Sequence, residues 1–289
     1  AQAPLDDLLV FHVVFGKTVP DISLNAVANL GYAEGQFLKP VYPGDTLSAT
    51  SEVIGLKENS NRKTGTVYVR STGFNQAVLS YVRWVMVRKR DEATPAPKAQ
   101  VPELAPAVSP DVLGAGCPKI AGKLWDAALA GSTHRFKDYR AGECIDHVDG
   151  MTVEEAEHML ATRLYQNTAK VHFNQFSEAK GRFGRRLIYG GHVISLARAL
   201  SFNGLGNVFH VAGINGGRHV APLFAGGTVF AWSEIVETAD VPAQSDVGAL
   251  RIRTRATRDL PCGDFPEKDA TAEEPGVILD FDYWALIPR

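Results

Sequence analysis

The sequence has little net charge, no long apolar run and no paired cysteines. Its 289 residues carry 30 Lys and Arg against 32 Asp and Glu, so no basic surface for nucleic acid is expected. No apolar run approaches the roughly 20 residues of a membrane-spanning helix. Cys117, Cys144 and Cys262 lie far apart without a CxxC pair, which argues against a disulfide framework and a thiolate metal site. We therefore expect a cytoplasmic protein that acts on a small molecule, with no metal and no nucleic-acid or membrane partner.

Proline is concentrated in one stretch near the middle of the chain. Between Asp91 and Gly116 the apolar periodicity stops, and prolines stand at positions 95, 97, 102, 106 and 110. Such a composition favours an extended, semi-rigid connector. The pattern predicts an N-terminal half over residues 1–90, a Pro/Ala-rich linker over 91–133 and a C-terminal half over 134–289.

The two halves resemble each other, which indicates an internal repeat. Five positions of the first half reappear 182 residues later: Gly31, Pro40, Gly44, Thr46 and Glu52 as Gly213, Pro222, Gly226, Thr228 and Glu234. Residues 67–70 and 79–84 likewise parallel residues 250–253 and 279–284. Because residue 1 corresponds to about residue 183 of the second half, we expect the first half to be incomplete at its start.

Each half is expected to form one apolar helix followed by antiparallel strands. The apolar spacing over residues 193–200 predicts a buried helix that ends at Asn203-Gly204. Residues 250–257 and 277–284 alternate apolar and charged side chains, as half-buried strands do. The arginines of the first of these strands are interpreted as a solvated sheet face, with contacts to CoA phosphates as the alternative.

Four segments together resemble the MaoC-like dehydratases, also called type 2 enoyl-CoA hydratases. They are residues 136–143, 152–155, 167–174 (NTAKVHFN) and 187–191 (LIYGG). The family pattern is approximately D-x-N-P-L-H-x-D, followed by a glycine that opens the central helix. His172 and Gly190 match its histidine and its glycine, whereas Asn167 and Asn174 stand where the family has acids. The resemblance implies an α+β double hot-dog fold, in which each half wraps an antiparallel sheet around a central helix.

The resemblance implies an acyl-CoA hydratase or dehydratase with one active site, in the second half. Hydration of a thioester-conjugated double bond needs a base for the water and a donor for the thioester oxygen. His172, with a pKa near 6.5, is expected to be that general acid/base. Unlike an aspartate, Asn167 can only orient a water molecule. The backbone N–H groups of Gly190 and Gly191 are expected to stabilise the enolate oxygen at the N-terminus of a helix.

The expected substrate is a branched enoyl-CoA that carries a second carboxylate, as the resemblance over both halves implies. An arginine can pair bidentately with such a carboxylate. The predicted substrate-binding residues are Arg182, Arg185, Arg186, Tyr189 and Asn174. The thioester activates the alkene by itself, so no cofactor is expected, and CoA arrives as part of the substrate. A homo-oligomer is also expected.

Three alternatives remain open at the level of sequence. The same fold hosts acyl-CoA thioesterases, and fold alone does not decide the reaction. Another type 2 enoyl-CoA hydratase, acting on saturated fatty acyl chains, would share the same motif. A non-catalytic acyl-CoA-binding subunit would explain the loss of the leading aspartate at Asn167. Of the other histidines, His192 and His219 are expected to lie nearest the site, and the rest are interpreted as structural or surface residues.

Overall fold

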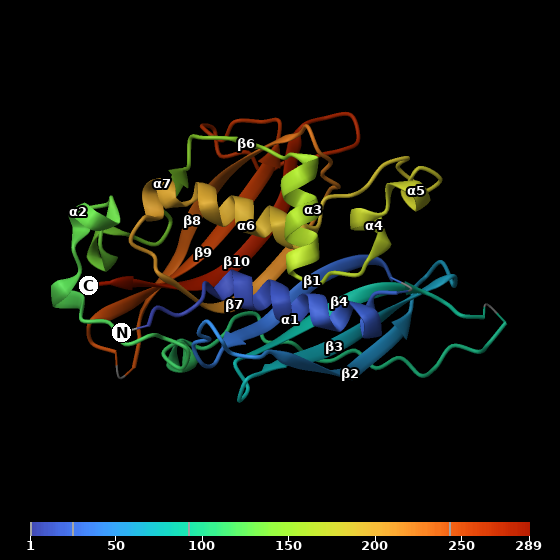
Figure 1. Ribbon diagram of the computed structural model, residues 1–289, viewed down its shortest axis with the longest axis horizontal. Coiled ribbons are helices and arrows are strands. Elements are labelled where there is room, and N and C mark those ends of the chain that lie inside the picture. The colour runs from blue at the N-terminus through green and yellow to red at the C-terminus, as the bar shows by residue number, and fades with distance from the viewer. Residues whose placement is uncertain (1, 25, 92, 243) are drawn as a thin grey trace.

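Both halves of the chain contribute to one continuous antiparallel sheet (Figure 1). The computed structural model describes residues 2–24, 26–91, 93–242 and 244–289. The first half contains α1 (Asp7–Ile22), β1 (Ala26–Phe37), β2 (Ser48–Glu58), β3 (Thr64–Phe74) and β4 (Leu79–Arg88). The linker holds the 3-10 helices η1 (Pro110–Val112) and η2 (Gly122–Leu124) and the short helix α2 (Ala127–Ala130). The second half contains η3 (Phe136–Asp138), β5 (Cys144–Asp146), β6 (Met151–Thr152), α3 (Glu155–Leu164), α4 (Lys170–Phe173), α5 (Gln175–Glu178), α6 (Gly190–Leu200), α7 (Phe202–Leu205), β7 (His210–His219), β8 (Thr228–Asp240), β9 (Val247–Arg258) and β10 (Gly276–Pro288).

The central helix of the first half is α1, which begins at a capped turn and is buried along one face. The Asp6 carboxylate accepts hydrogen bonds from the backbone N–H groups of Leu8 and Leu9, which have no partner inside the helix. Phe11 and Val14 are fully buried. The sheet β1–β4 lies behind this helix in Figure 1, so α1 occupies the position expected of a hot-dog helix.

The central helix of the second half is α6, and it ends at Leu200, three residues before the break at Asn203-Gly204 that the sequence predicts. Asn203 and Gly204 leave the helical conformation, and Gly204 takes a φ of 99°, which glycine tolerates without a steric penalty. The predicted strands 250–257 and 277–284 lie within β9 and β10. These expectations are confirmed, and the arrangement of helix and strands occurs once in each half.

The halves meet at β1 and β7 and along their two helices. In the sheet the strand order is β2-β3-β4-β1-β7-β10-β9-β8-β5, with β6 paired to β8. Tyr32 pairs with Gly217 across the β1–β7 boundary. The helices lie on the same face of the sheet (Figure 1). His12 Nε2 of α1 is 2.8 Å from Ser195 Oγ of α6. The double hot-dog prediction is therefore confirmed.

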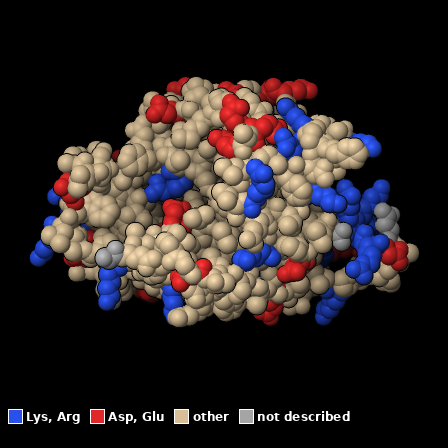
Figure 2. All heavy atoms as spheres, viewed as in Figure 1, with Lys and Arg blue, Asp and Glu red and all other residues tan. Residues whose placement is uncertain are grey.

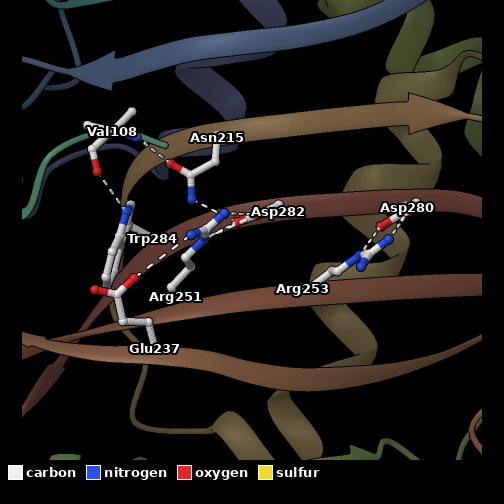
Figure 3. A network of polar contacts seen from close by, with 8 residues as sticks. All are labelled: Val108, Asn215, Glu237, Arg251, Arg253, Asp280, Asp282 and Trp284. Atoms are coloured by element: carbon white, nitrogen blue, oxygen red, sulfur yellow. Dashed lines mark hydrogen bonds and ion pairs between the residues drawn. The ribbon is translucent and has the colours of Figure 1, made fainter. Parts of the chain in front are cut away.

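The linker packs on the outer face of the sheet, away from the helices. Its Val108 N–H donates to Asn215 Oδ1 of β7 (2.8 Å), and its carbonyl accepts from Trp284 Nε1 of β10 (3.0 Å) (Figure 3). On the neighbouring strand β9 three arginines pair with acidic side chains: Arg251 with Asp282 and Arg253 with Asp280 of β10, and Arg255 with Glu267. Arg251 and Arg253 are partly exposed, as expected of a solvated sheet face, whereas Arg255 is buried.

Among the described residues, no helix combines the length and the apolar character that a membrane crossing requires.

Candidate active site

His172 lies on the one-turn helix α4, and its ring is held by a single backbone contact. Its Nδ1 lies 2.9 Å from the Leu187 carbonyl oxygen, which can only accept, so the proton resides on Nδ1. Nε2 is then left as an unprotonated acceptor. Burial lowers the pKa of His172 to about 4, below the value near 6.5 that the sequence alone suggests. The imidazole is therefore neutral at pH 7, with a free lone pair on Nε2.

Tyr189 connects His172 to the start of α6. The two rings lie 5.6 Å apart, and Tyr189 is the N-cap residue of the helix that Gly190 and Gly191 open. Its side chain makes no cap hydrogen bond. Within the described part of the chain no acceptor is recorded for the N–H groups of Gly190 and Gly191. Two unpaired donors therefore lie at the positive end of a helix dipole, one residue from a side chain in contact with His172.

His158, on α3, fixes the position of the Tyr189 backbone by a hydrogen bond. Its Nε2 accepts a hydrogen bond of 2.8 Å from the backbone N–H of Tyr189, and its ring lies 6.2 Å from that of His172. Because Nε2 accepts, Nδ1 carries the proton, and this buried N–H has no partner among the described residues. Burial lowers the pKa of His158 to about 3, with His172 adding to the shift. From the sequence His158 was expected to be a structural or surface residue; it is buried, and its hydrogen bond with Tyr189 supports the site.

The first half contributes His12, from the middle of α1. Besides its contact with Ser195, the ring stacks on Tyr165 at 4.7 Å, and Nδ1 lies 3.4 Å from the Tyr189 hydroxyl. Its pKa falls to about 3 through burial, with His192 adding to the shift. The site is therefore built by both halves, although the histidine motif belongs to the second alone.

His219, at the end of β7, covers the start of α6. A side-chain carbon added at Gly190 would lie 2.6 Å from the His219 ring, so glycine is required there for close approach. Nε2 of His219 is buried and has no partner among the residues that the structure describes. Burial lowers the pKa of His219 to about 4, and nearby His172 contributes. The expectation that His219 lies near the site is confirmed by these contacts.

The two asparagines of the motif accept hydrogen bonds from nearby backbone N–H groups, and Asn174 is the N-cap residue of α5. Asn167 Oδ1 accepts from the backbone N–H of Ala169 (3.0 Å), immediately before the turn that carries His172. Asn174 Oδ1 accepts from the N–H of Ser177 (3.1 Å) at the start of α5. Both hold the backbone around His172, and their roles toward water and substrate stay predictions.

The three arginines of the loop after α5 separate into two groups. Arg182 and Arg185 are exposed, and the Arg185 guanidinium lies 3.9 Å from the centre of the Phe224 ring. Arg185 lines a cleft of about 620 Å³ with Phe183, Phe224 and residues of the β9–β10 connection. Arg186 pairs with Glu155 in the first turn of α3, which also carries Glu157. Figure 2 shows acidic side chains gathered where α3 begins. Recognition of a second carboxylate by these arginines stays a prediction.

Replacing Gly190 with alanine tests the start of α6 as the oxyanion site. The added carbon must displace the His219 ring and intrudes beside the free N–H groups. We expect kcat for hydration to fall by about 100-fold, the size of effect that removing one oxyanion donor has. Gly216→Ala is the matched control, because the nearest atom to its added carbon lies 4.0 Å away. Equal loss of activity in both variants would contradict the assignment.

Comparison with known proteins shows the family of the chain. Residues 2–259 match the family model described as mesaconyl-CoA hydratase. The chain belongs to the mesaconyl-CoA hydratase family. The β-methylmalyl-CoA dehydratase of Chloroflexus aurantiacus is 60% identical over 100% of this chain and 83% of that protein. The mesaconyl-CoA hydratase of Cereibacter sphaeroides is also 60% identical, over 99% and 83%.

Solved structures show the same double hot-dog fold for this member of the mesaconyl-CoA hydratase family. A MaoC domain protein dehydratase from Chloroflexus aurantiacus superposes with a TM-score of 0.93 at 60% identity, over 99% of this chain and 83% of that one. A Mycobacterium tuberculosis protein described as a double hotdog fold gives a TM-score of 0.69 at 25% identity, over 100% and 83%. The protein is an enzyme of the hydro-lyase class, as the resemblance predicted.

One supporting residue, His12, could have been found from the repeat. His12 lies 183 residues before Ser195, one more than the offset of 182 that relates the two halves nearby, so a contact between the two central helices was available from the sequence. His158 lies four residues before Thr162, which places both on one face of a helix, and the Thr162 hydroxyl donates to the His158 carbonyl. Nothing in the sequence signals that His158 receives the N–H of Tyr189.

Proposed function

We propose that this enzyme reversibly interconverts mesaconyl-CoA (2-methylfumaryl-CoA) and 2-methylmalyl-CoA (β-methylmalyl-CoA). The observation that supports it most is the neutral His172, with Nε2 free, in contact with the residue that precedes the two unpaired N–H groups of α6. A base and an oxyanion donor side by side are what hydration of a thioester-conjugated alkene requires. The names of the 60% identical relatives supply the choice of acyl group.

Hydration begins when Nε2 of His172 takes a proton from water. The hydroxyl oxygen bonds to the alkene carbon β to the thioester, and the π electrons move onto the thioester oxygen. The N–H groups of Gly190 and Gly191 hold this enolate oxygen. The imidazolium then returns the proton to the α carbon, so one water is added and the enzyme regains its starting state. A lowered histidine pKa favours this last transfer, because it makes the imidazolium a stronger acid.

No electrons are exchanged with an acceptor in these steps, so a redox cofactor has no role in the proposed reaction. CoA is part of the substrate, and the buried His158 and His12 support the site without touching the reacting atoms. Assembly of several copies and a place in the cytoplasm stay predictions from the sequence.

The test is to incubate the purified enzyme with mesaconyl-CoA and, separately, with crotonyl-CoA. We expect loss of enoyl absorbance without release of free thiol, and faster loss with mesaconyl-CoA. Thiol release without hydration would identify a thioesterase instead. Faster turnover of crotonyl-CoA would favour another type 2 hydratase, and binding without either reaction would favour a non-catalytic subunit.

A further inference from the structure

A guanidinium group is buried in the first half without a counter-ion. Arg83, on β4, has no exposed surface, and no carboxylate of the described residues lies within ion-pair distance of it. One nitrogen, Nη2, donates to Thr18 Oγ1 at 3.0 Å, and the group lies 4.3 Å from the centre of the Phe15 ring. Nε and Nη1 have no hydrogen-bond partner in the described chain. A buried arginine stays charged, and a buried charge without a partner is strongly unfavourable.

Polar side chains surround this guanidinium on the inner face of the sheet. Tyr32 of β1 pairs directly opposite Arg83, so both side chains lie on one face. Tyr81 precedes Arg83 by two residues on β4 and shares that face. The Tyr81 hydroxyl and both ends of the Asn29 amide are buried, and they too lack hydrogen bonds to the described residues. The cluster offers N–H and O–H donors and a positive charge, which is the set of groups that binds a carboxylate.

Short contacts connect the Arg83 cluster to the proposed site. Tyr32 packs against His219 at 6.0 Å, and the His219 ring covers Gly190. The Phe15 ring, which the Arg83 guanidinium covers, lies 5.6 Å from the ring of Tyr189. Arg83, Tyr32 and Tyr81 also shift the pKa of Tyr189, so the four polar groups share one buried region. The loop arginine Arg185 lies in an exposed cleft instead.

We infer that Arg83, with Tyr32, Tyr81 and Asn29, binds the free carboxylate of the acyl group, so that the first half selects the substrate while the second half performs the reaction. The inference rests on the proposed function. In mesaconyl-CoA the carboxylate is attached to the carbon that receives the hydroxyl. Charge-assisted hydrogen bonds from the unpaired Nε–H or Nη1–H to that carboxylate would therefore fix this carbon relative to His172.

The test compares Arg83→Met with the unchanged enzyme on two substrates of matched shape. Mesaconyl-CoA carries a carboxylate where 2-methylbut-2-enoyl-CoA carries a methyl group. We expect kcat/KM for mesaconyl-CoA to fall by about 100-fold, because a buried charge pair loses one partner, with less than threefold change for the methyl analogue. Arg88→Met, an exposed arginine on the same strand, should leave both values unchanged. Arg185→Met should change the two values equally, because the analogues share their CoA portion.

An equal fall for both substrates in Arg83→Met, or no fall for either, would overturn the inference. A second test measures the binding of two CoA thioesters to the unaltered enzyme, so it depends neither on the folding of a variant nor on catalysis. Succinyl-CoA and butyryl-CoA also differ by carboxylate against methyl, and calorimetry should show succinyl-CoA binding at least tenfold more tightly. Equal affinities would refute carboxylate recognition. If mesaconyl-CoA is not hydrated while succinyl-CoA is preferred, the proposed reaction fails and the carboxylate site stands.

Discussion

Replacing His172 with alanine is expected to lower kcat for the hydration of mesaconyl-CoA by about 1000-fold, within the range that a general acid/base contributes. The reason lies in how the ring is held. The Leu187 carbonyl fixes the proton on Nδ1 and leaves Nε2 to accept from water. Among the described residues no carboxylate pairs with His172. The initial rate of enoyl absorbance loss at saturating substrate measures the effect.

His134→Ala is the matched control for this variant, because His134 is exposed and far from the motif in sequence. We expect its kcat to equal that of the unaltered enzyme. His172→Gln keeps an amide that can contact Leu187 but cannot take up a proton, and it should be as inactive as alanine. Hydration that survives within about tenfold in His172→Ala would show that another group transfers the proton.

The fold could be predicted from the sequence because its signal is repeated and periodic. Gly31 and Gly213 occupy equivalent positions in the two halves. The alternation of apolar and charged residues over 277–284 is enough by itself to predict a strand. The pairing of Tyr32 with Gly217 could not be predicted, because the join between the halves depends on which strand edges meet. The path of the linker could not be predicted either, because its proline content predicts an extended chain but does not say on which face of the sheet Val108 lies.

The site could be predicted only where its residues are close in the sequence. His172 and Gly190 form one local motif, and the structure connects them through Tyr189. Arg83 lies 89 residues before His172 and on a strand whose alternation is ordinary, so no local pattern distinguishes it from a surface arginine. Its burial results from the packing of α1 over β4, which is a tertiary effect.

The buried histidines should make the enzyme unusually sensitive to mild acid. His12, His147 and His158 have almost no exposed surface, and burial lowers their pKa values to about 3, 4 and 3. In the unfolded chain each returns to a pKa near 6.5. Above pH 6.5 neither state binds these protons, and the full stability is present. Between pH 6.5 and about 4 only the unfolded state binds them, so stability falls as pH falls.

These three protons alone correspond to a loss of about 4 kcal/mol per pH unit below pH 6, a large share of a typical folding free energy of about 5–15 kcal/mol. His172 and His219, whose pKa values are also lowered to about 4, add to this slope. Urea unfolding at pH 7.5, 6.5 and 5.5 measures this slope. His147→Gln should reduce it by the contribution of one proton, about 1.4 kcal/mol per pH unit, since His147 is buried between the Asn203 carbonyl and the Ser233 hydroxyl. His134→Gln, at an exposed position, should leave the slope unchanged. A stability that stays constant from pH 7.5 to 5.5 would mean that these histidines are already protonated in the folded enzyme. In that case His158, beside the site, would not be neutral either.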